Sequence, residues 1–182
     1  MLDLDLSYGE LVHPSCIDEY EKSENPVSVE TLNSTNAANL KLYMASAISG
    51  LKLSELIAQQ LPILWVIDED GELQFAIEEY LNAENPALRI GRFGKLPRVI
   101  NTESGEWSRI GHPSLLPSKL GRIGGELVLK DGDWVLSNRS GRYGVVFGRK
   151  EAQLESVKRL LHSFGLTVIV DWVPAAQREM RS

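Results

Sequence analysis

The sequence predicts an α+β fold with a mainly antiparallel sheet, and three observations support this prediction. Apolar residues recur at helical spacing in the first third of the chain, which indicates an N-terminal helical region. Short runs of alternating apolar residues, separated by turn residues, then predict a series of hairpins. A long amphipathic helix and a last apolar strand follow, so we expect the C-terminal helix to pack on the sheet.

Residues 1–60 are predicted to form a helical and irregular part. The stretch LDLDLS near the start is typical of a short strand, and CIDEYEKS predicts one or two helical turns. A clear helix is expected from the N-cap candidates at 33–36 to Gly50, and a shorter one before Pro62. The apolar residues that predict the first of these helices are Leu40, Tyr43, Met44 and Ile48.

Residues 61–173 are predicted to form the sheet part of one compact domain, followed by a tail at 174–182. The sequence DEDG predicts the turn of a first hairpin, and Asp131-Gly132 that of a second, between strands 126–130 and 134–137. The segment between the hairpins is mostly loop, with a predicted strand at 98–101. A strand at YGVVFG, a helix that ends at Gly165 and the strand LTVIVDWV complete the pattern.

Composition excludes several classes of protein. The chain of 182 residues is 43% hydrophobic, enough for a core, yet no apolar run reaches the ~20 residues of a membrane helix. The N-terminus lacks a signal-peptide pattern, and the single Cys16 excludes an internal disulfide and a cysteine zinc cluster. Three scattered histidines do not have metal-ligand spacing. We therefore expect a cytoplasmic protein without metal or cofactor.

Charge is divided unequally along the chain. Residues 1–84 contain sixteen acidic and three basic residues, whereas residues 85–182 contain nine acidic and sixteen basic residues. One interpretation is that the second half faces an anion and the first half a basic partner. The other is that the two halves attract each other in the folded chain.

The glycines of LGRIGGEL do not form a phosphate-binding loop. A dinucleotide fingerprint needs a helix after its glycines, and a strand follows here. Turns and bulges are the simpler explanation for these residues. Gly125 would also allow the backbone to approach a ligand or another strand closely.

Two residues are candidates for proton transfer. His112 lies in the loop sequence GHPSLLPS, and a histidine in a loop is suited to acid–base chemistry near neutral pH. Glu126 enters a predicted strand among apolar residues, so it either pairs with a cation or acts as a base. Its potential partners are Arg122, Arg139 and Arg142.

The sequence SNRSGRYG concentrates hydroxyl and guanidinium groups. The pair Ser140-Gly141 is expected to interrupt the strand and form a turn. Arginine and short hydroxyl side chains suit a phosphate or a carboxylate, which indicates an anion-binding turn. The alternative is a hydrogen-bonded turn with solvated arginines.

The block HPS…GGEL…DG…SNRSGRY resembles a domain shared by plant IQ-motif calmodulin-binding proteins and the C-terminal regions of some bacterial polymorphic toxins. The resemblance covers residues 112–165, extends toward residue 61, and does not include residues 1–60. Pro113 replaces a serine of that pattern, and Arg142 replaces a histidine. The residues that match are His112, Ser114, Gly125, Glu126, Asn138, Ser140, Gly141 and Tyr143.

The resemblance and the residues together predict a small bacterial toxin- or effector-related protein whose enzyme-like pocket acts on a phosphorylated or nucleotide-like ligand. The alternative is a non-catalytic immunity or antitoxin partner that uses its acidic first half; the sequence does not decide whether the protein is an enzyme. Nucleic-acid binding is disfavoured because few aromatic residues accompany the basic ones. The expected catalytic residues are His112, Glu126 and Tyr143, and the expected ligand-binding residues are Ser114, Arg122, Asn138, Arg139, Ser140 and Arg142.

Overall fold

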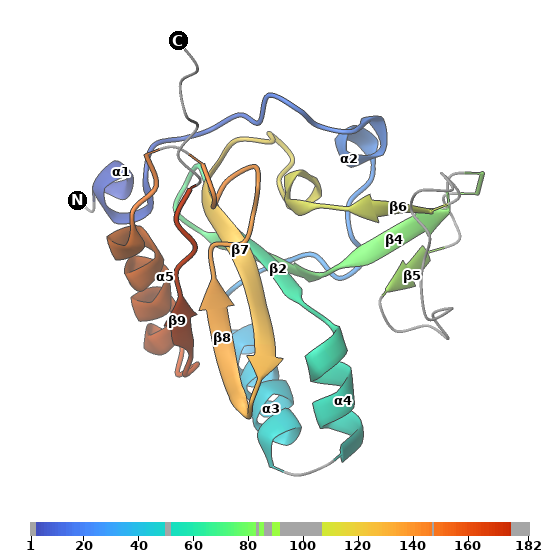
Figure 1. The fold of residues 1–182 in the computed structure, drawn as a ribbon, viewed down its shortest axis with the longest axis vertical. Helices are drawn as coiled ribbons and strands as arrows, with labels where there is room; N and C mark the ends of the chain where they lie inside the picture. The colour runs from blue at the N-terminus through green and yellow to red at the C-terminus, as the bar shows by residue number, and fades with distance from the viewer. Residues whose placement is uncertain are drawn as a thin grey trace.

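The computed structural model describes residues 3–49, 52–82, 84–85, 89–91, 107–146 and 148–175, and it has the predicted α+β architecture. A six-stranded, mostly antiparallel sheet carries helices from both ends of the chain (Figure 1). The N-terminal helices are α1 (Leu4–Tyr8), α2 (Glu19–Ser23), α3 (Ser34–Ile48) and α4 (Lys52–Gln60). The C-terminal helix is α5 (Glu151–Ser163). A short 3₁₀ helix, η2 (His112–Leu115), lies between α4 and α5 in the sequence.

The main sheet has the strand order β1-β3-β2-β7-β8-β9. Its strands are β1 (Glu30–Thr31), β2 (Ile63–Asp68), β3 (Leu73–Ile77), β7 (Gly121–Lys130), β8 (Asp133–Ser137) and β9 (Ile169–Asp171). A smaller sheet of order β5-β4-β6 extends to one side of it (Figure 1). Its strands are β4 (Glu79–Asn82), β5 (Arg89–Gly91) and β6 (Trp107–Ile110).

Both predicted hairpins are confirmed. β2 and β3 pair antiparallel on either side of the DEDG turn. β7 and β8 also pair antiparallel, and Lys130 opposite Asp133 is the last pair before their turn. The two residues between these positions, Asp131 and Gly132, have φ of 53° and 89°. Positive φ at both central residues defines the type I′ turn, whose twist matches that of the flanking strands. Local turn chemistry therefore sets the register of β7 and β8.

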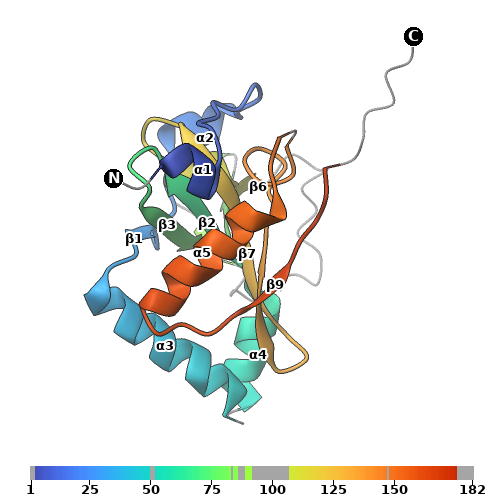
Figure 2. The same ribbon diagram turned by 90° about the vertical axis from the view of Figure 1, so that its left-hand side faces the viewer.

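The predicted C-terminal helix is also confirmed, and it ends as its sequence indicates. At its C-terminus Gly165 has a φ of 76°; its N–H donates to His162 O, and the Leu166 N–H donates to Leu161 O. These two bonds form the Schellman motif, which returns the chain toward the sheet. β9 then pairs parallel to β8, so β8, α5 and β9 form a β-α-β unit. Figure 2 shows α5 lying across one face of the sheet.

Alternation along the strands gives the sheet two different apolar faces. The odd-numbered residues of β2, such as Trp65, join the large core that includes side chains of α3 and α5. The even-numbered residues Leu64 and Val66 join a smaller cluster on the other face, with Leu115, Leu116 and Tyr143. The smaller cluster leaves part of this second face to polar residues, and the candidate site lies there.

Two strand predictions are wrong in the described part of the chain. Residues 4–8 form helix α1, because the Asp3 carboxylate accepts the Leu6 N–H at 3.1 Å and thereby caps a helix. The segment YGVVFG is a turn, since Gly144 N and Val145 N both donate to Ser140 O and its described residues pair with no strand.

Other boundaries differ or lie outside the described residues. β7 begins at Gly121, five residues earlier than expected, and β1 of the N-terminal part joins the sheet by pairing with β3. The predicted strand at 98–101 and residues 176–182 of the predicted tail lie outside the described residues.

Gly125 of β7 lies very close to the backbone at the end of β8. A Cβ atom at this position would lie 1.8 Å from Ser137 O, so Gly125→Ala is expected to lower the free energy of unfolding by about 3 kcal/mol or more. The matched control is Gly141→Ala, because nothing lies within 4 Å of its Cβ position, and its effect should stay within about 1 kcal/mol. Urea unfolding measures both variants. Equal stability of the two would contradict the close approach.

Candidate functional site

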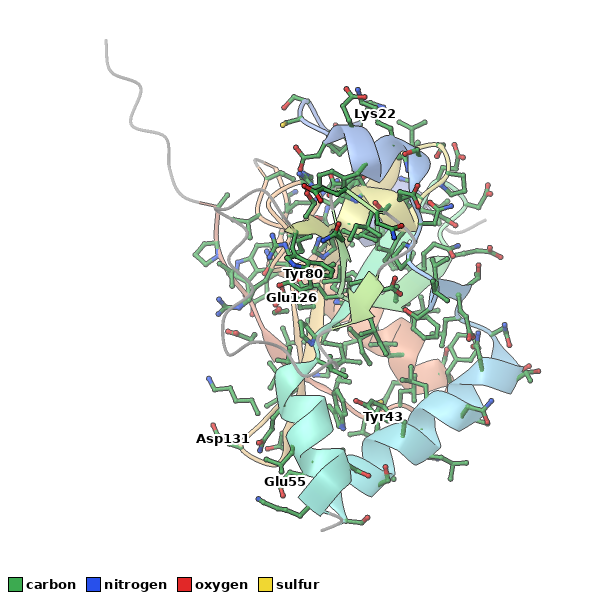
Figure 3. The ribbon with its side chains drawn as sticks, turned by 90° about the vertical axis from the view of Figure 1, so that its right-hand side faces the viewer. Lys22, Tyr43, Glu55, Tyr80, Glu126 and Asp131 are labelled. Atoms are coloured by element: carbon green, nitrogen blue, oxygen red, sulfur yellow. The ribbon has the colours of Figure 1, made fainter. Side chains whose placement is uncertain are left out.

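A polar pocket of about 220 Å³ opens on the second face of the sheet, beside the smaller apolar cluster. Five of the nine predicted site residues line it: His112, Glu126, Arg139, Ser140 and Arg142. The other lining residues are Leu64, Glu78, Arg109, Gly111 and Gly141. Glu126, labelled in Figure 3, lies between α2 with Lys22 above and helices α3 and α4 below.

Three segments supply the walls of this pocket. β6 ends at Ile110, and the chain turns through Gly111 into η2, which begins with His112. β7 contributes Glu126, which lies directly opposite Leu64 of β2. The third wall is the turn after β8, in which the Ser140 hydroxyl accepts the Tyr143 N–H at 3.3 Å. β8 has already ended at Ser137, and this bond confirms the turn predicted at Ser140-Gly141.

His112 is a neutral side chain with a defined tautomer. Its Nε2 lies 2.9 Å from Gly125 O, and a carbonyl oxygen only accepts, so Nε2 carries the proton. Burial lowers the pKa of His112 to about 4, and the guanidinium groups of Arg109 and Arg142 act in the same direction. Nδ1 therefore serves as a hydrogen-bond acceptor at neutral pH. The proton-transfer role that the sequence suggested for His112 stays a prediction.

Glu126 lies half-buried near the middle of β7, among the residues that line the pocket. Its backbone carbonyl accepts the Ser137 hydroxyl at 3.3 Å, which holds this part of β7 against β8. A carboxylate on the pocket wall is positioned to accept a hydrogen bond or a proton from a ligand. Both expectations for Glu126, pairing and catalysis, remain predictions.

Two arginines of the pocket are exposed, and each has one carboxylate partner. Arg109 Nη1 lies 3.4 Å from Glu78 Oε1, and Arg139 Nη2 lies 3.1 Å from Asp171 Oδ2. The side chains of Arg109 and Arg139 are 59% and 56% exposed. The Arg139–Asp171 pair is exposed on both sides and contributes about 0–1 kcal/mol, so a bound anion can replace Asp171 at little cost, whereas the Glu78 side chain is only 3% exposed.

Arg142 has a different environment. Its Nη1 donates to Glu21 Oε1, and its Nη2 lies 3.2 Å from Asp18 Oδ2. The Glu21 side chain is only 1% exposed, so this pair is not available for easy exchange. Arg142, expected to bind an anion of the ligand, is instead held by two carboxylates of the chain.

The remaining four predicted residues have partners elsewhere. Tyr143 is fully buried in the smaller cluster, and its hydroxyl donates to Lys119 O at 2.8 Å. Burial raises the pKa of its phenol. Ser114 is buried beside α2 and donates to Glu21 O at 3.5 Å. Asn138 makes two hydrogen bonds with the backbone of Val173. Its Oδ1 accepts the Val173 N–H at 2.7 Å, and its Nδ2 donates to Val173 O at 2.8 Å.

Arg122 connects three segments at the other end of β7. Its guanidinium donates to the Asp5 carboxylate, to Gly9 O at 3.0 Å and to Glu69 O at 3.3 Å. These contacts fix α1 and the β2–β3 turn to the strand. Arg122 therefore stabilises the fold rather than lining the pocket wall.

Part of the charge difference between the two halves is neutralised by ion pairs within the molecule. Among the described residues, four ion pairs join an acid of residues 1–84 to a base of residues 85–182. This pattern agrees with the interpretation that the halves attract each other. The pairs are Arg109–Glu78, Arg122–Asp5, Arg142–Asp18 and Arg142–Glu21.

Sequence reasoning missed Arg109, Glu78 and Glu21. Arg109 stands three residues before His112, but nothing in its local sequence distinguishes it from a solvated arginine. Glu21 lies 90 positions from Gly111, whose N–H it accepts at 3.0 Å. A contact over such a separation has no local signal.

Within the described ranges, no group of three or more His, Cys, Asp and Glu side chains is arranged to hold a metal ion. None of the helices in those ranges has both the length and the apolar character to cross a membrane. No protein-family model, curated protein or solved structure matches this chain. The resemblance drawn from the sequence motifs thus stays a prediction.

The low pKa of His112 predicts a pH dependence of stability. Because the folded protein keeps the imidazole neutral, the unfolded chain alone takes up a proton as the pH falls below about 6.5. The stability that the neutral imidazole contributes is therefore fully present above that pH. The free energy of unfolding falls by at most about 3 kcal/mol as the pH is lowered toward 4. Urea unfolding between pH 7 and pH 4.5, compared with His112→Gln, isolates it. Parallel pH profiles of the two proteins would contradict a neutral imidazole in the folded protein.

Proposed function

We propose that the pocket binds a phosphorylated or nucleotide-like small molecule, and that Glu126 acts on it as a general base. One observation supports the proposal above all: two exposed guanidinium groups, from β6 and from the turn after β8, line the same pocket as Glu126 and a neutral histidine. A toxin- or effector-related role rests on the resemblance alone.

The anion would bind to Arg109 and Arg139. Their forked N–H donors match phosphate oxygens, and both guanidinium-bearing side chains are more than half exposed, although Arg109 contacts the buried carboxylate of Glu78. Arg142 does not take this part, because Asp18 and Glu21 already bind its terminal nitrogens. Its role is to hold the turn that presents Arg139.

The uncharged part of the ligand would meet hydrogen-bond acceptors. Nδ1 of His112 accepts from a hydroxyl or an amine, and the carboxylate of Glu126 accepts a hydrogen bond or removes a proton. A ribose hydroxyl or a base amine supplies such donors, whereas inorganic phosphate at neutral pH supplies few. The pocket is thus expected to prefer a nucleotide to the free anion.

Replacement of the exposed arginines tests the anion contact. Arg109→Gln and Arg139→Gln should each weaken AMP binding about tenfold, since a hydrogen bond to a charged group contributes ~1.5 kcal/mol or more. Isothermal titration at low salt measures the Kd, which should also rise with added salt. Arg159→Gln is the control, because Arg159 lies exposed on α5. Absence of AMP and phosphate binding by the unaltered protein would overturn the proposal.

Replacement of Glu126 separates binding from turnover. Glu126→Gln keeps the size of the side chain and removes a negative charge, so AMP should bind as tightly as before or more tightly. Loss of the base should slow conversion of AMP at least about 100-fold, followed by ³¹P NMR. If Glu126→Ala leaves both the Kd and the conversion unchanged, Glu126 has no role at the site.

A further inference from the structure

The N-terminal half reaches the pocket through helix α2. Glu21 of this helix is almost completely buried, although it is an acidic residue on a helix of five residues. Its Oε1 accepts both the Gly111 N–H, at 3.0 Å, and Nη1 of Arg142. Its Oε2 accepts the Asp18 N–H at 3.1 Å. One carboxylate thus joins the residue before His112 to the turn that contains Ser140.

The packing around this carboxylate depends on a glycine. A Cβ atom on Gly111 would lie 2.5 Å from Glu21 Oε1 and 2.9 Å from Arg142 Nη1. Only the missing side chain allows both groups to approach the backbone at this point. A side chain at position 111 would therefore displace the end of at least one of these two groups.

Energetics favour a geometric role for this ion pair. Burial of two charges costs about as much as their attraction returns, so such a pair adds little net stability compared with apolar packing. Its effect on position is definite, because Glu21 accepts from a backbone N–H beside one wall and from a side chain of another. Asp18 adds a second contact to Arg142, at 3.2 Å.

We infer that Glu21 is a positioning residue of the pocket, which fixes His112 on one wall and the turn Ser140–Arg142 on the other. The effect of Glu21 on ligand binding rests on the proposed function. The position of His112 can nevertheless be measured without any ligand. The N-terminal segment is therefore a working part of the site, although Glu21 contacts the ligand only through other residues.

The test follows the imidazole of His112 by long-range ¹H–¹⁵N NMR, with His112→Gln identifying its signals. The unaltered protein should show a neutral ring protonated at Nε2 at pH 7. In Glu21→Ala, and in Glu21→Asp, whose carboxylate is one methylene shorter, the ring should lose its contact with Gly125 O. The chemical shifts of both ring nitrogens should then change, because Nε2 no longer donates to a fixed acceptor.

Two variants serve as controls for this measurement. Glu21→Gln keeps an oxygen at the position of Oε1 for Gly111 and Arg142, although its amide nitrogen cannot accept the Asp18 N–H, and it should therefore preserve the His112 signals without the charge. Glu19→Gln changes a side chain of the same helix that is 90% exposed, and it should have no effect. A folded Ala or Asp variant with unchanged His112 signals would overturn the inference. If neither folds, displaced signals in Glu21→Gln overturn it and unchanged signals support it.

AMP titration distinguishes this inference from the proposed function. When AMP binds the unaltered protein, its Kd should rise about tenfold or more in Glu21→Asp and stay within about threefold in Glu21→Gln. A rise of equal size in both variants would indicate a role of charge alone and would overturn the positioning role. When AMP does not bind at all, the proposed function fails, and the His112 signals alone decide the role of Glu21.

Discussion

The site depends on the close approach of β7 to the chain that follows β8. An added Cβ on Gly125 would meet Ser137 O at 1.8 Å, and one on Gly144 would meet Asn138 O at 2.0 Å and Gly124 O at 2.2 Å. Side chains at these positions would separate the turn from the strand. Because they are absent, the turn that contains Ser140 and Arg142 lies directly against β7. The glycines of this region thus serve backbone packing.

A second constraint comes from the distribution of charge. Four ion pairs between the acidic first half and the basic second half connect α1, the start of α2 and the link between β3 and β4 with β6, β7 and the turn after β8. The pairs Arg109–Glu78, Arg122–Asp5 and Arg142–Glu21 each contain one side chain that is at most 7% exposed and hold elements in place, whereas the Arg139–Asp171 pair is exposed on both sides. The expectation of an immunity-like partner stays a prediction, and these pairs reduce the acidic charge available to it.

Much of the fold follows from short-range patterns, and the errors have local causes. Asp131-Gly132 and Gly165 predict their turn and helix end because positive φ is a property of one or two residues. LDLDLS alternates as a strand does, yet the Asp3 cap favours a helix. YGVVFG has the composition of a strand, but the bonds of Gly144 and Val145 to Ser140 O form a turn. In both cases a specific hydrogen bond outweighs the average preference of the residues.

The sequence by itself determined the α+β class, both hairpins, the C-terminal helix and the segments that supply the pocket. These depend on periodicity and turn chemistry, which act over a few residues. Only the tertiary structure decided that Tyr143 enters an apolar cluster, that Arg142 binds Asp18 and Glu21, and that Arg109 joins the pocket. Those outcomes depend on side chains about 80 to 120 positions apart, or on the packing of separate strands. For such contacts, electrostatics and steric fit select partners that no local pattern specifies.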